Sequence, residues 1–160
     1  MNAVSSTEID IQTASDAPGI PDDSEIRRWI CETLDGAGKR GPYEVSVRIV
    51  DTEEMQALNR EFRDKDRPTN VLSFGAASLP GLPDAERRVL GDLVVCAPVL
   101  HDEAVRQLKP LAQHWAHILV HGTLHLLGYD HEAQTDAERM ESLETRILAA
   151  GGVGDPYSEG

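Results

Sequence analysis

A long apolar segment between Pro110 and Gly128 constrains the fold of this chain more than any other feature. Its Leu, Ile, Val and Trp residues recur on nearly all sides of a helix. Pro110 suits the start of a helix, and Gly128 suits the left-handed residue that follows its end. The pattern therefore predicts a helix from Pro110 to Leu127 that lies buried at the centre of the molecule.

The same segment carries most of the histidines of the chain. Five of the six lie between positions 114 and 131: His114, His117, His121, His125 and His131. At about 100° per residue, the first four fall within an arc of about 80° on one face of the helix. Burying a row of imidazoles costs free energy unless their nitrogens have partners, and a metal ion is a favoured partner of neutral imidazole. The pattern favours a metal site over a set of unrelated core histidines.

Helix geometry selects three of these histidines as ligands of one ion. His121 and His125 are one turn apart and can share an ion, whereas His117 and His125 are separated by about 12 Å along the axis. The chain turns at a glycine after the helix, so His131 can return to the same ion. Three nitrogens at this spacing suit a tetrahedral zinc ion with its fourth position open. The predicted cofactor is one Zn²⁺ per chain, bound by His121, His125 and His131.

The ligand spacing is also that of the metzincin proteases. In those enzymes a glutamate follows the first histidine and activates the zinc-bound water. Gly122 occupies that position in this chain. A zinc metallopeptidase-like hydrolase is thus an alternative that keeps the ligands and lacks the usual base.

A second segment, residues 58–74 (LNREFRDKDRPTNVLSF), stands out by its charge. It holds four basic and three acidic side chains: Arg60, Arg63, Lys65 and Arg67 against Glu61, Asp64 and Asp66. The planar guanidinium of arginine suits a phosphate better than the ammonium of lysine does. From charge alone, however, a solvated helix end with local ion pairs is the better interpretation.

Taken together, these motifs resemble those of the YbeY family, bacterial endoribonucleases of ribosomal RNA maturation. The resemblance is carried by residues 58–74, LGDLVV at 90–95, HWAHILVHGTLHLLGYDH at 114–131 and DPY at 155–157. It covers most of the chain from about residue 43 onward. It implies a single-strand-specific endoribonuclease that acts in 3′-end maturation of the small-subunit (16S) rRNA and in ribosome quality control.

The resemblance also implies roles for individual residues. His121, His125 and His131 match the metal ligands of the family, and Arg63 matches its functionally important arginine. We expect the three-histidine zinc site to activate water or to polarise the phosphate, and Arg63 to bind that phosphate. The sequence leaves open whether water or the RNA 2′-hydroxyl is the nucleophile. A non-catalytic, zinc-stabilised ribosome assembly factor is the third candidate function.

Four further side chains are candidates for supporting roles. Asp92 or Asp130 could orient a histidine ligand through its second ring nitrogen. We expect His114 and His117, one to two turns before the ligands, to be structural, to face RNA or to support the site.

Length and periodicity predict a single α+β domain over residues 1–160. We expect one mixed sheet of about four strands packed with about five helices, including the central histidine-bearing helix. The expected strands are 8–12, 43–50, 71–74 and 89–96, and the helices are about 22–36, 52–63, 97–108, 110–127 and 135–149. Capping boxes are predicted at Asp51 with Glu54 and at Thr135 with Glu138. Residues 1–5 and 151–160 are expected to be flexible.

Charge and composition narrow the partners and the location. The formal net charge of −13 excludes a broad basic face that coats duplex DNA, so no DNA partner is expected. It indicates that single-stranded rRNA is delivered by the small ribosomal subunit or by ribosomal proteins. Cys31 and Cys96 are expected to be free thiols. Without a basic leader or an apolar run of about 20 residues, the expected location is the cytoplasm, with no membrane partner.

Overall fold

The computed structural model describes residues 7–39, 41–75, 88–129, 134–154 and 156. Four strands and five helices lie in these ranges, which confirms the predicted α+β class with a mixed sheet. Residues 1–5, expected to be flexible, lie outside them. The elements in chain order are β1 (Glu8–Thr13), α1 (Asp23–Gly36), β2 (Tyr43–Val50), α2 (Thr52–Arg63), β3 (Val71–Gly75), β4 (Arg88–Cys96), α3 (Ala97–Gln107), α4 (Leu111–Leu126) and α5 (Gln134–Ala150).

The sheet has the strand order β1-β2-β4-β3. β1, β2 and β4 run parallel, and β3 is the antiparallel strand at one edge. The parallel pairs need crossover connections, and α1 and α2 lie in those connections along the chain. In β2 the alternating residues Val45, Val47 and Ile49 are buried in the main core, as the period-2 pattern predicts.

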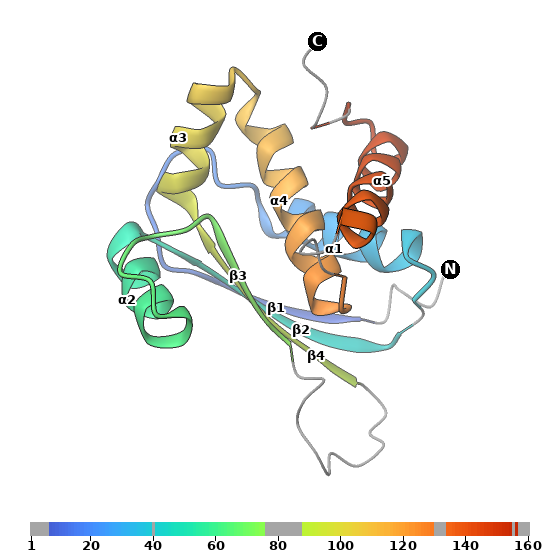
Figure 1. Ribbon diagram of the computed structural model, residues 1–160, viewed down its shortest axis with the longest axis horizontal. Helices are drawn as coiled ribbons and strands as arrows, with labels where there is room; N and C mark the ends of the chain where they lie inside the picture. The colour runs from blue at the N-terminus through green and yellow to red at the C-terminus, as the bar shows by residue number, and fades with distance from the viewer. Residues whose placement is uncertain (1–6, 40, 76–87, 130–133, 155, 157–160) are drawn as a thin grey trace.

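Helices cover both faces of the sheet, but unequally. The large core lies on the face covered by α1, α4 and α5, whereas α2 lies on the other face (Figure 1). Trp115, Leu119 and Leu124 of α4 are almost fully buried, so the predicted central helix is confirmed. A separate small cluster joins α2 to the sheet: Val50, Met55, Leu72, Val94 and Cys96.

The predicted capping boxes are wrong. Asp51 is the N-cap residue of α2, but its side chain makes no bond to the helix. Its Oδ1 instead accepts a hydrogen bond from Ser15 Oγ at 2.5 Å, and Glu54 pairs with Arg48 at 2.6 and 2.9 Å. Ser15, which follows β1, and Arg48 of β2 thus take the place of the local partners. At the start of α5, Thr135 lies one residue inside the helix and therefore does not cap it.

Two other expectations concern the environment of the protein. Cys31 and Cys96 are free thiols, as predicted. Within the described ranges, none of the helices has the length and apolar character needed to cross a membrane.

Candidate functional site

His117, His121 and His125 follow one another along one face of α4. His121 Nε2 and His125 Nε2 approach to 3.1 Å. Two nitrogens bound at about 2.0–2.1 Å to one tetrahedral ion lie about 3.3 Å apart, so this separation fits a shared ion. The third predicted ligand, His131, lies outside the described residues.

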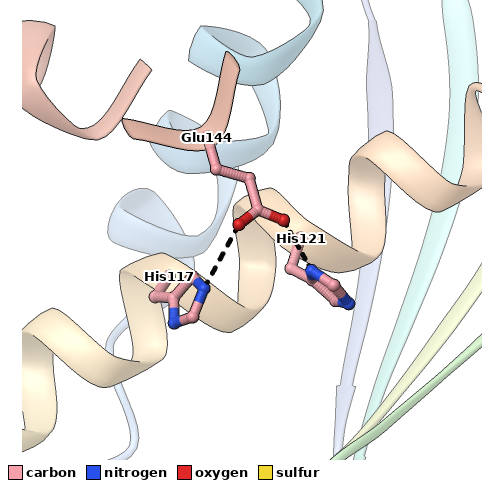
Figure 2. Close-up of side chains that lie close together, drawn as sticks. All are labelled: His117, His121 and Glu144. Atoms are coloured by element: carbon pink, nitrogen blue, oxygen red, sulfur yellow. Dashed lines mark hydrogen bonds and ion pairs between the residues drawn. The ribbon is translucent and has the colours of Figure 1, made fainter. Parts of the chain in front are cut away.

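A buried carboxylate from α5 lies against this row (Figure 2). Glu144 Oε1 is 2.5 Å from His121 Nδ1, and its Oε2 is 3.4 Å from His117 Nε2. An ionised carboxylate only accepts hydrogen bonds, so His121 Nδ1 carries the proton and donates it. The lone pair of His121 then resides on Nε2, on the side of His125. Glu144 therefore sets the tautomer that a metal ligand requires.

These side chains offer two overlapping sets of metal donors. Ligand atoms of His117, His121 and Glu144 all lie within 4.8 Å of one another, and this group could hold a metal ion. The second set consists of His121 and His125 through their Nε2 atoms. His121 belongs to both sets; with its Nδ1 proton donated to Glu144, Nε2 beside His125 is the nitrogen that can bind an ion.

Sequence reasoning missed Glu144, although a signal was present. In α5 the buried residues Met140, Leu143, Ile147 and Leu148 form an apolar stripe, and Glu144 lies within it. A carboxylate at such a position needs a partner, because burying an unpaired charge is costly. The stripe therefore marked Glu144 as a candidate for a site.

The orienting role predicted for Asp92 is wrong. Asp92 shares the side of β4 that Val94 presents to α2, away from the histidines. It is exposed there and lines a different cavity together with Phe62 and Phe74. The other candidate, Asp130, lies outside the described residues.

Replacing Glu144 by glutamine is expected to weaken metal binding by about 10–100-fold, the usual effect of losing an outer carboxylate. The glutamine has the same shape but no longer fixes the proton on His121 Nδ1. Titration of the metal-free protein with zinc against a competing chelator measures the change. Glu141→Gln, one turn away in position and equal in charge change, is the control. Equal affinities of Glu144→Gln and the wild type would contradict this role.

His121 and His125 line a cationic cavity of about 480 Å³. It brings together Arg63, His121 and His125, three of the four residues that sequence analysis selected. Among the described residues that line it, none is acidic: Asn59, Arg63, Lys65, Arg67, Thr69, Asn70, Val71, Ser73, His121 and His125.

Local hydrogen bonds hold the cationic segment that follows α2. Asp64 adopts a left-handed conformation, with a φ of 57°, and ends the helix. The buried Asn59 accepts from the Lys65 N–H through its backbone carbonyl, at 3.3 Å, and donates from Nδ2 to the Arg67 carbonyl at 2.8 Å. These bonds keep residues 65–67 against α2, so that Arg63, Lys65 and Arg67 line one cavity.

The ion pairs expected of a solvated helix end involve a different arginine. Arg60 lies 3.6 Å from Asp66. Among the described residues, Arg63 has no acidic partner and its side chain is exposed to the cavity. Arg63 is thus available to an anionic ligand, which the charge pattern alone did not favour.

Gly122, at the position of the protease glutamate, faces the sheet. A Cβ atom there would lie 2.9 Å from Leu93 Cδ2 and 3.2 Å from Val71 Cγ2. The Gly122 carbonyl also accepts a hydrogen bond from Ser73 Oγ at 3.0 Å. A side chain at this position would crowd the contact between α4 and the sheet, which glycine fits.

His114 belongs to a separate network. It is 3% exposed, and its Nε2 lies 2.9 Å from Glu103 Oε1 on α3. His117 instead contacts Glu144. Of the roles considered for these two histidines, His114 thus joins two helices and His117 supports the carboxylate beside His121.

Imidazoles that face three cationic side chains suit a class of protein that uses a metal ion on a phosphate-containing substrate. Residues 10–152 match the family model of Endoribonuclease YbeY. Endoribonuclease YbeY of Halorhodospira halophila is 56% identical over 139 residues, 87% of this chain and 89% of that protein. That of Cellvibrio japonicus is 53% identical over 156 residues, 98% and 86% of the two chains. The chain therefore belongs to the YbeY family.

A solved structure agrees with the fold. The solution structure of a Thermotoga maritima protein superposes with a TM-score of 0.54 and 24% sequence identity. The match covers 94% of this chain and 99% of that one. The small α+β architecture is therefore shared with an independently determined structure.

Proposed function

We propose that this protein is a zinc-dependent endoribonuclease specific for single-stranded RNA. The observation that carries the proposal is the cavity that brings Arg63 together with His121 and His125 and whose described lining residues include no acidic side chain. Relatives that are about half identical bear the name endoribonuclease, which supports RNA as the substrate. The proposed process is 3′-end maturation of small-subunit rRNA and ribosome quality control.

In this proposal His121, His125 and His131 hold the ion. The 3.1 Å approach of two Nε2 atoms and the tautomer set by Glu144 suit imidazole ligation. When bound, zinc supplies a Lewis acid for the phosphodiester and lowers the pKa of a water molecule to about 7.

The side chains opposite the histidines bind the RNA backbone. Arg63 holds the scissile phosphate through its planar fork and stabilises the charge that builds up on its oxygens in the transition state. Lys65 and Arg67 bind the neighbouring phosphates along the same wall. An unpaired strand can turn its phosphates into a cavity of this size more readily than a duplex can.

The charge of the whole protein supports a delivered substrate. A net charge of −13 repels free RNA except near the cationic cavity. In this proposal the small ribosomal subunit or one of its proteins brings the rRNA to the cavity in the cytoplasm.

Cleavage of an rRNA 3′-region fragment by the zinc-loaded protein tests this function. We expect cleavage of the single strand, little cleavage of the matching duplex or of single-stranded DNA, and loss of activity with a chelator. Zinc should restore the activity. A product with a 2′,3′-cyclic phosphate would identify the 2′-hydroxyl as nucleophile, whereas a product without it supports attack by water. Cleavage of peptides alone would indicate a metallopeptidase, and rRNA binding without any cleavage an assembly factor.

A further inference from the structure

Asn70 contributes a hydrogen-bond acceptor, its side-chain Oδ1, to the cationic cavity. Its Nδ2 lies 3.3 Å from both carboxylate oxygens of Glu103. Because an ionised carboxylate only accepts hydrogen bonds, the NH₂ of Asn70 must face Glu103 and the carbonyl Oδ1 must face away. Within the described part of the chain, no residue donates a hydrogen bond to this Oδ1. Asn70 lines the cavity and is partly exposed, so Oδ1 is an acceptor available to a ligand.

Glu103 is itself firmly held in this orientation. His114 Nε2 lies 2.9 Å from its Oε1, and His114 is almost completely buried. Burial raises the pKa of Glu103, but hydrogen bonds from His114 and Asn70 outweigh that effect and leave the pKa below its usual value. At neutral pH the carboxylate is therefore ionised and remains an acceptor. The backbone of Asn70 is fixed as well, because its carbonyl accepts from the Cys96 N–H at 2.9 Å.

The cationic groups that line the cavity differ from Asn70 Oδ1 because they can only donate hydrogen bonds. Arg63, Lys65 and Arg67 are donors only, and Ser73 Oγ already donates to the Gly122 carbonyl. A phosphate oxygen cannot bond to Asn70 Oδ1, because both atoms are acceptors. A ligand that fits the cations and this acceptor together carries phosphate and a hydrogen-bond donor close by. In single-stranded RNA, the ribose 2′-hydroxyl is a donor close to the phosphate in every nucleotide, whereas the N–H donors of the bases lie farther from it and differ from base to base.

We propose that Asn70 Oδ1 accepts a hydrogen bond from the 2′-hydroxyl of a nucleotide in the cleft and thereby selects RNA over DNA. Glu103 is the positioning residue that keeps the acceptor turned toward the cavity. This assignment rests on the proposed endoribonuclease function and identifies the residue that recognises the ribose.

Chimeric oligonucleotides test the assignment. The zinc-loaded protein is assayed on an RNA substrate in which single nucleotides around the cleavage site carry 2′-deoxy or 2′-fluoro groups, neither of which can donate. For the wild type, we expect one position at which both groups lower kcat/KM by about tenfold, the usual effect of one lost hydrogen bond. In Asn70→Ala, the all-ribose substrate is cut more slowly and the penalty at that position disappears, because the partner of the hydroxyl is already missing.

A second variant keeps Asn70 but no longer fixes the orientation of its side-chain amide. In Glu103→Gln the new amide can donate to Oδ1 and turn the Asn70 side chain around, so the deoxy penalty should shrink. Gln107→Ala, at the exposed end of the same helix, should keep the full penalty. Circular dichroism and thermal melting verify that each variant is folded.

The outcomes separate this assignment from the function on which it rests. If RNA is cut but the penalty persists in Asn70→Ala, or follows the base rather than the sugar, Asn70 does not read the 2′-hydroxyl. If the wild type cuts no RNA at all, the endoribonuclease function fails and this assignment fails with it.

Discussion

Replacing His125 by alanine is expected to abolish both zinc binding and RNA cleavage. The variant loses one of the two Nε2 atoms that approach to 3.1 Å, and a single remaining imidazole of that pair cannot hold the ion in place. The loss of affinity should exceed the roughly 10–100-fold expected for an outer-sphere partner. Elemental analysis of the purified protein gives the zinc content, and the rRNA fragment assay gives the activity.

This experiment also decides between the two donor sets. His101→Ala, on α3 and away from the histidine row, is the matched control and should keep one zinc ion per chain. If His125→Ala keeps its zinc with unchanged affinity, the metal belongs to the group of His117, His121 and Glu144 instead. The proposed ligand set would then be wrong.

Replacing Arg63 by alanine is expected to keep the zinc and to lower kcat by about 10²–10³-fold. A side chain that stabilises charge developing in a transition state typically contributes this much. Arg63 meets the histidines only across the cavity, so its removal leaves the imidazoles and Glu144 in place. Single-turnover cleavage with a saturating amount of enzyme isolates this effect from RNA binding.

Two other variants make the Arg63 experiment specific. Arg60→Ala removes the same charge one turn earlier, from a side chain that pairs with Asp66, and should cut RNA at nearly the wild-type rate. Arg63→Lys keeps the charge without the planar fork, so it should recover part of the lost rate. A normal cleavage rate in Arg63→Ala would exclude the phosphate role.

The elements of this fold follow from local pattern to a large extent. The alternation of β2 and the all-round apolarity of α4 predicted a buried strand and the central helix, because side-chain periods of 2 and 3.6 are fixed by backbone geometry. The capping boxes failed for a related reason: Asp51 and Glu54 meet the local pattern, but Ser15 and Arg48 offer better partners through the tertiary fold.

The site was predictable where its residues lie close together in sequence. His121 and His125 follow from helical spacing, and Arg63 followed from the family motif rather than from charge. Glu144 approaches His121 from a different helix, 23 positions later, and the sequence does not specify how α5 packs on α4. The same holds for Asn70 and Glu103, which are 33 positions apart and meet only when α3 lies beside the loop before β3.

The two faces of the sheet carry cores of unequal size, and this difference affects how firmly each wall of the cationic cavity is held. Its histidine wall belongs to α4 in the large core, whereas Arg63 stands on α2, which a small apolar cluster attaches to the opposite face. Regions with few buried apolar contacts open at lower free energy than the rest of a domain. We therefore expect the wall that carries Arg63 to open at a lower free energy than the wall that carries His121 and His125. The residues proposed to bind RNA and those proposed to hold the ion thus belong to separately packed parts of one small domain.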